Sequence, residues 1–158
     1  MLKRWMWVVV PVVVVALAVG LWAFQPWRLF TSSTVDEAAP AGATDGSVLA
    51  SGTFEDGSKT TTGRAVVLEL GDGSRVLRLE DLAGSDGPDV HVWITDQPSG
   101  GDHGSYDDGR YVRLGNLKAT HGNQNYAIPD DADLAGLRSV VIWCDRFNTA
   151  FGTAPVQL

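Results

Sequence analysis

The sequence has little of what most catalytic and metal sites are made from. Its 158 residues include one cysteine, three histidines and two methionines. It contains no Gly-x-Ser-x-Gly turn, no His-Glu-x-x-His helix and no phosphate-binding glycine loop. A single cysteine excludes an intrachain disulfide and any site built from two thiolates of one chain. We therefore expect no independent enzymatic activity.

Positive charge is also scarce beyond the first residues. The formal net charge is −7, and from Val48 onward the chain holds 9 Lys and Arg against 16 Asp and Glu. An acidic domain repels phosphate backbones, so we expect no nucleic-acid partner. Gly and Asp are frequent in this region, which is typical of short strands joined by tight turns.

The first thirty residues, in contrast, contain one long hydrophobic run. Residues 5–24 carry no charge, and as a helix they would span roughly 30 Å, the thickness of a bilayer core. Lys3 and Arg4 precede the run, and this excess of positive charge predicts a single-pass cell-membrane protein with a cytoplasmic N-terminus and an extracytoplasmic domain. Tryptophans, which favour the membrane interface, flank it: Trp5, Trp7, Trp22 and Trp27.

A cleaved signal peptide is the alternative interpretation of the same residues. Ala16-Leu17-Ala18 resembles a small-x-small cleavage site after an apolar core. Cleavage there would leave the apolar residues 19–24 at the new N-terminus, which is unfavourable in water. The expected division is a membrane anchor over residues 1–30, a flexible linker rich in small and polar residues over 31–47, and a domain over 48–158.

The domain shows the two-residue period of β-strands and no convincing helical period. Residues 89–95 alternate cleanly, with Val90, Val92 and Ile94 on one face and His91 on the other. The expected fold is all-β, an antiparallel β-sandwich or flattened barrel, preceded by one N-terminal transmembrane helix. The expected strands cover residues 49–55, 64–70, 75–80, 89–95, 111–114, 125–128, 138–144 and 154–158.

Any sulfur ligand or redox thiol must be Cys144. This residue ends the apolar run 139–144 and shares its strand face with Val140 and Ile142. Both faces of the run are apolar, so the pattern does not settle which way the thiol points. Four roles are open for it: a small buried hydrophobe, a free thiol, an interchain partner, or a ligand to a metal or haem.

His91 and Trp93 are second candidates for cofactor binding. They share the face opposite Val90, and a ligand role for His91 would require a second donor such as Cys144 on a neighbouring strand. Residues 99–109 include three carboxylates and one histidine, but their spacing matches no EF-hand loop. We expect a solvated, mobile loop there.

Seven short motifs follow one another along the domain: Gly52-Thr53-Phe54 with Thr62-Gly63, Leu77-x-Leu79-x-x-Leu82, Gly87-Pro88-Asp89-Val90-His91-Val92, Leu114-Gly115-x-Leu117-Lys118, Gly122-Asn123-Gln124-Asn125-Tyr126-x-Ile128-Pro129, Ser139-Val140-Val141-Ile142-Trp143-Cys144-x-x-Phe147 and Phe151-Gly152-x-Ala154. In these motifs residues 49–158 resemble the DM-thirteen domain, also called the electron-transfer DM domain. The resemblance does not extend to the hydrophobic run or the linker.

This resemblance implies a β-domain of exported or membrane-attached proteins. It implies that Cys144 acts in electron transfer with a redox partner protein, as a bare thiol or by holding haem or a metal. One departure is Lys59, where many relatives carry a histidine, so a two-ligand metal site is less expected here. The alternative function is a non-catalytic surface binding or adhesion module in which Cys144 is structural.

Overall fold

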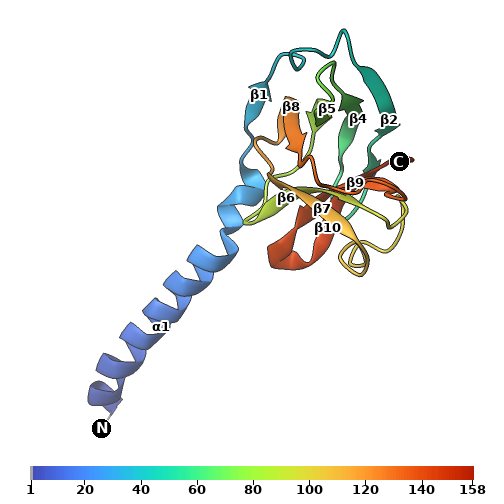
Figure 1. The fold of residues 1–158 in the computed structure, drawn as a ribbon. Coiled ribbons are helices and arrows are strands. Elements are labelled where there is room, and N and C mark those ends of the chain that lie inside the picture. Colours follow the sequence, from blue (N-terminus) through green and yellow to red (C-terminus); the bar gives the residue numbers. More distant parts are fainter. Residues whose placement is uncertain (1) are drawn as a thin grey trace.

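The structure is a computed structural model, and it describes residues 2–158. Over these residues an α-helix, α1, projects from a domain of ten strands (Figure 1). Two short 3-10 helices are also present: η1 precedes the first strand and η2 follows the ninth. The elements are α1 (Leu2–Phe24), η1 (Pro26–Phe30), β1 (Thr34–Asp36), β2 (Ser47–Thr53), β3 (Glu55–Asp56), β4 (Thr62–Glu69), β5 (Arg75–Ala83), β6 (Val90–Thr95), β7 (Tyr111–Asn116), β8 (His121–Ile128), β9 (Ser139–Cys144), η2 (Asp145–Phe147) and β10 (Thr149–Pro155).

The helix α1 has the length and composition of a membrane span. The apolar stretch Trp5–Arg28 has none of its length buried inside the molecule. An exposed apolar helix of this size is stable in a lipid environment and not in water. The single apolar N-terminal helix predicted from the sequence is therefore present. A signal sequence has the same length and composition, and the helix is compatible with either.

Two five-stranded sheets form the domain. The first sheet has the order β1-β8-β5-β4-β2 and is antiparallel except where β1 pairs with β8. The second sheet has the order β3-β10-β9-β6-β7, and all its pairings are antiparallel. The sheets do not close on each other, which confirms the sandwich and excludes the flattened barrel. Their inner faces supply the core, including Val67, Leu77, Leu79, Tyr126 and Ile128 from the first sheet and Val92, Ile94, Val140, Ile142 and Phe151 from the second.

Strand alternation places the side chains of β6 as predicted. Val90, Val92 and Ile94 belong to the core between the sheets, and His91 lies on the opposite face. The neighbouring strand β9 is buried at all six positions. It lies between β6 and β10 in the second sheet, so both of its edges are hydrogen-bonded and both of its faces are covered. The structure therefore settles what the apolar pattern of β9 could not: its inward face carries Cys144.

The segment expected to be a flexible linker, residues 31–47, is attached to the domain at its start. Residues 34–36 form β1, which extends the first sheet by a parallel pairing with β8. Just before it, the amide of Ser33 donates to the Thr120 hydroxyl over 2.9 Å, and that hydroxyl donates to the Ser33 carbonyl over 3.0 Å. This polar segment has no hydrophobic period because it lies on a sheet edge.

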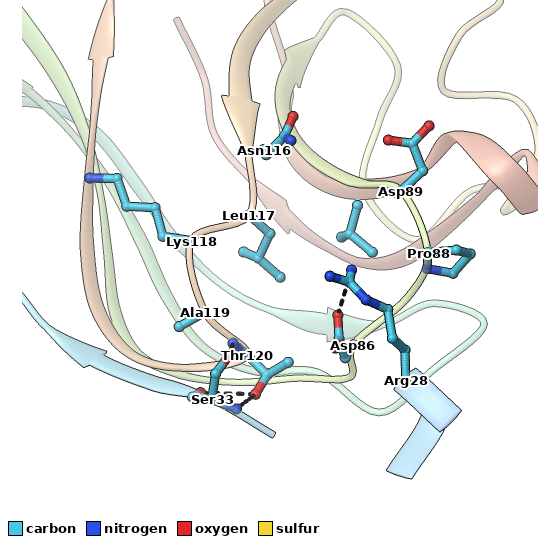
Figure 2. A pocket seen from close by; sticks show the side chains of 11 residues that line it. Arg28, Ser33, Asp86, Pro88, Asp89, Asn116, Leu117, Lys118, Ala119 and Thr120 are labelled. Atoms are coloured by element: carbon cyan, nitrogen blue, oxygen red, sulfur yellow. Dashed lines mark hydrogen bonds and ion pairs between the residues drawn. The ribbon is translucent and has the colours of Figure 1, made fainter. Parts of the chain in front are cut away.

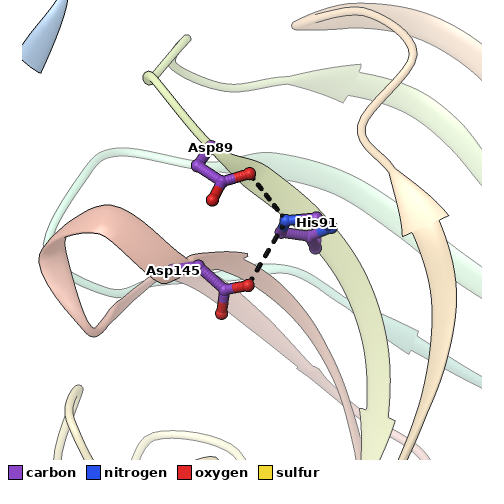
Figure 3. A group of neighbouring side chains, drawn as sticks. All are labelled: Asp89, His91 and Asp145. Atoms are coloured by element: carbon purple, nitrogen blue, oxygen red, sulfur yellow. Dashed lines mark hydrogen bonds and ion pairs between the residues drawn. The ribbon is translucent and has the colours of Figure 1, made fainter. Parts of the chain in front are cut away.

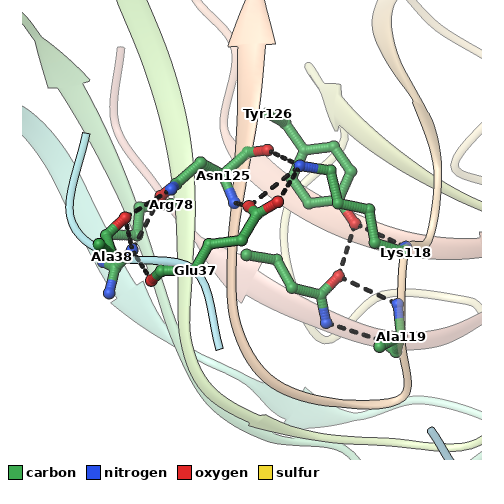
Figure 4. A network of polar contacts seen from close by, with 8 residues as sticks. Glu37, Ala38, Arg78, Lys118, Ala119, Asn125 and Tyr126 are labelled. Carbon is green, nitrogen blue, oxygen red and sulfur yellow. Dashed lines mark hydrogen bonds and ion pairs between the residues drawn. The ribbon is translucent and has the colours of Figure 1, made fainter. Parts of the chain in front are cut away.

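Glu37 continues this attachment on the surface of β8 (Figure 4). Its carboxylate accepts hydrogen bonds from Lys118 Nζ at 2.7 Å and from the amide of Asn125 at 2.6 Å. The hydrogen bond from Lys118 is the main cause of a lowered pKa for Glu37. Arg78 donates to the carbonyls of Glu37 and Ala38, which holds the backbone of the segment against the sheet.

The loop between β6 and β7 folds onto the outer face of the second sheet, although a solvated, mobile loop was expected there. Tyr106 is buried, its carbonyl accepts from the Thr95 hydroxyl, and its own hydroxyl accepts from the amide of Gly101. The amide of Ala150 donates to the carbonyl of His103 at 2.8 Å. The outer face needs this cover because it is apolar as well, with Trp93, Val141, Trp143 and Ala150.

Candidate functional site

Cys144 is the last residue of β9, and its side chain lies in the core between the sheets. It pairs with Val90 on β6 and with Thr149 on β10. Its exposed fraction is 0%. The next residue leaves the strand, and the amide of Asp145 donates to the carbonyl of Asp89 at 2.9 Å, which fixes the start of η2 beside the start of β6. The thiol is therefore sealed between two strands and a tight turn.

Two opposing effects act on the proton of this thiol. Burial raises the pKa of Cys144, because a thiolate loses its hydration in the core. The nearby backbone of Phe147, Asp89 and Arg146 acts to lower the pKa, but it does not outweigh the burial. The thiol is consequently protonated at neutral pH. The residues around it also do not fit a haem, which needs a wide pocket next to its axial ligand, whereas this sulfur has no exposed surface.

The outer face of the second sheet carries a stack of three aromatic rings. Trp93 stacks on Tyr111 with 4.4 Å between ring centroids and on Trp143 with 4.9 Å. The guanidinium of Arg113 lies 4.7 Å from the Trp93 ring, a favourable distance for a cation and an aromatic face. Both indoles are buried, and within residues 2–158 the Trp93 N–H has no hydrogen-bond partner.

A polar cluster adjoins this stack where β6 begins and β9 ends (Figure 3). His91 Nε2 lies 2.8 Å from Asp89 Oδ1 and 3.4 Å from Asp145 Oδ2. Asp145 also accepts a 2.7 Å hydrogen bond from Trp143 Nε1, and Arg113 lies 3.2 Å from its second oxygen. The carboxylate of Asp145 therefore connects the aromatic stack to the histidine.

This cluster is the place in residues 2–158 where ligand atoms suited to a metal ion come closest together. One atom each from Asp89, His91 and Asp145 lie within 4.8 Å of one another. One imidazole and two carboxylates are a donor set that Zn²⁺ or Mn²⁺ accepts. In the structure, however, Arg113 forms an ion pair with Asp145, and the His91 ring is hydrogen-bonded to Asp89. These contacts account for the arrangement of the cluster.

The candidate residues from the sequence fall on two sides of one sheet. His91 and Trp93 lie on the outer face, and Cys144 lies on the inner face. His91 is paired with Trp143, one residue before the cysteine, so its imidazole points away from the sulfur. Cys144 and His91 are therefore not brought together as ligands of one group. The sequence did not predict Asp145 as a partner of His91. Its position directly after Cys144 indicates that role only once β6 and β9 are known to pair.

A polar cavity of about 260 Å³ lies where the N-terminal segment meets the domain (Figure 2). Arg28 reaches into it from η1, donates to the carbonyl of Gly87 at 2.7 Å and lies 3.5 Å from Asp86. Lys118 and Thr120 line the opposite side. These contacts attach the end of the N-terminal segment to the loop that leads into β6.

The structure is thus a small all-β domain that follows an apolar helix and buries the thiol of Cys144. The family model described as Electron transfer DM13 matches residues 53–156. The chain belongs to this family, which assigns the domain a general role in electron transfer. No curated protein and no solved structure matches the chain.

Proposed function

We propose that this protein is a membrane-anchored extracytoplasmic domain that takes part in electron transfer through Cys144. The observation that carries the proposal is the family match over residues 53–156, described as Electron transfer DM13, in a chain whose one cysteine, Cys144, lies inside the matched region. A sulfur with a redox role in this chain must therefore be that of Cys144. The apolar helix α1 supplies the anchor, and the charge at its start favours a cytoplasmic N-terminus.

The burial of the sulfur restricts how Cys144 exchanges electrons. A thiol with no exposed surface cannot be attacked by a soluble disulfide or form a mixed disulfide with a partner without opening of the fold. Oxidation of the protonated thiol by one electron would release its proton and leave a thiyl radical, and the electron would have to pass through the protein to an oxidising partner docked outside; reduction would return both. Trp143 is the covalent neighbour of Cys144, and its ring belongs to the aromatic stack of the outer face.

A surface binding or adhesion module is the second candidate, and the same burial favours it. A free cysteine at zero exposure packs as a small apolar side chain. In that case the electron-transfer role of the family would not depend on this thiol, and Cys144→Ala would change only stability.

Voltammetry of the full chain in lipid nanodiscs, before and after the substitution Cys144→Ala, tests the proposal. We expect a reversible signal in the wild type that is absent from a folded Cys144→Ala protein. Circular dichroism would establish that the variant is folded, and Val67→Ala, a truncation in the core on β4 of the first sheet, would serve as a control that leaves the sulfur and the aromatic stack in place. A signal unchanged in Cys144→Ala, or none in the wild type together with no haem or metal absorbance, would refute the role of the cysteine.

A further inference from the structure

The turn that follows β9 exposes an aromatic side chain beside the end of α1. Among the described residues after β1, the exposed large apolar side chains are Val48, Leu49 and Phe147. Val48 and Leu49 lie on β2, at the edge of the domain away from the helix (Figure 1). Phe147 lies in η2 and is 43% exposed. Its ring centroid is 6.4 Å from that of Phe24, the last residue of α1.

The position of Phe24 sets the height of this turn above a bilayer. The apolar part of α1 has the length of a bilayer core, so its last residue marks the boundary between hydrocarbon and headgroups. Aromatic side chains prefer that boundary. Trp27 and Phe30, in η1 directly after α1, are exposed as well, Phe30 almost completely. Phe147 therefore joins a group of aromatic residues from two separate parts of the chain.

The junction between helix and domain is short and held by hydrogen bonds. Arg28 donates to the carbonyl of Gly87, and the hydroxyl of Thr31 donates to Asp86 at 2.8 Å. With β1 starting at residue 34, only residues 25–33 separate α1 from the first sheet. This length and these contacts leave the domain little freedom to lift the turn away from the surface.

We propose that the turn Asp145–Asn148 docks into the headgroup region of the bilayer that α1 crosses, with Phe147 as the inserted side chain. The proposal rests on the proposed function in one respect, the retention of α1 as a membrane anchor. Arg146 is exposed next to Phe147, where a cation favours phosphate headgroups. The docking turns the end of β9 that carries Cys144 toward the lipid surface, so that the electron donor or acceptor approaches at the membrane.

A fluorescent label placed on the turn tests this directly. The full chain with Phe147→Cys would be labelled with an environment-sensitive maleimide dye and reconstituted into liposomes with or without nitroxide-labelled phospholipid. Val48→Cys is the matched control, because Val48 is also an exposed apolar residue, at 60%, but lies on β2. The unsubstituted chain, whose thiol is sealed, gives the background labelling. Arg146→Cys provides a second label site that keeps Phe147.

We expect the dye at position 147 to be blue-shifted, quenched by the lipid nitroxide and protected from aqueous iodide, with the opposite pattern at position 48. Equal behaviour of the two positions would overturn the docking. Protection from iodide without nitroxide quenching would overturn it in favour of a protein occupant, such as a second copy. Alkaline carbonate extraction and the intact mass report separately on the anchor: a cleaved or extractable chain overturns the anchor, and the docking with it.

Discussion

Replacing Asp145 with alanine should destabilise the β-domain by about 2–3 kcal/mol, because it leaves the indole N–H of Trp143 without a partner. The donor and acceptor are 2.7 Å apart, and the tryptophan is 1% exposed, so the indole N–H loses a short hydrogen bond to a charged acceptor. A hydrogen bond to a charged group contributes about 1.5–3 kcal/mol, and an unpaired buried donor costs about 1–3 kcal/mol. The half-exposed ion pair with Arg113 adds less than about 1 kcal/mol.

Asp145→Asn is the informative comparison, since its amide oxygen can still accept the indole proton. We expect it to cost less than about 1 kcal/mol, the loss of charge alone. Both free energies would be measured on the full chain in detergent by urea titration, followed by the near-ultraviolet circular dichroism of the tryptophans, to which a free helix contributes little. The reasoning fails if alanine costs less than about 0.5 kcal/mol, or if asparagine costs as much as alanine.

Two further predictions concern pH. Because the pKa of Cys144 is raised, the folded domain keeps its thiol proton at a pH where the unfolded chain has lost it. The contribution of this thiol to the free energy of unfolding is therefore fully present below about pH 8.5. It falls as the pH rises toward the pKa of the folded state, by at most about 1.4 kcal/mol per pH unit. Urea midpoints of wild type and Cys144→Ala should therefore converge above that pH, and parallel curves would contradict this. The lowered pKa of Glu37 has the opposite sign: its contribution, under about 1 kcal/mol, is present above the ordinary value of 4.5 and is lost as the pH falls. Glu37→Gln should remove it and speed hydrogen exchange at the β1–β8 pairing, whereas Glu69→Gln, on an exposed position of β4, should do neither.

The strands of the core were predictable because their two-residue period is strong. Residues 89–95 were assigned to within one residue of β6, and the long uncharged run near the N-terminus predicted the apolar helix α1. The edge strand β1 was not predictable. It consists of polar residues with no hydrophobic period, and it forms through backbone bonds to β8 and side-chain contacts of Glu37.

The candidate site was predictable only residue by residue. Cys144 was found by counting and His91 by alternation, but their relation depends on which strands are neighbours. Once β6 pairs with β9, the register puts His91 beside Trp143 and leaves the thiol on the other side. The covering loop was missed for a similar reason, because the need to bury Tyr106 arises only when the indoles of two strands meet on the outer face.

The strand β9 separates two environments within a single peptide unit. Trp143 and Cys144 are consecutive, yet one faces the aromatic outer surface and the other the interior. A one-residue insertion or deletion between Ser139 and Trp143 would exchange them, because side chains alternate from face to face. The indole would then have to fit where a thiol fits, and the sulfur would reach the outer face. The spacing from the start of β9 to its cysteine is thus fixed by the fold itself, whatever chemistry the sulfur performs.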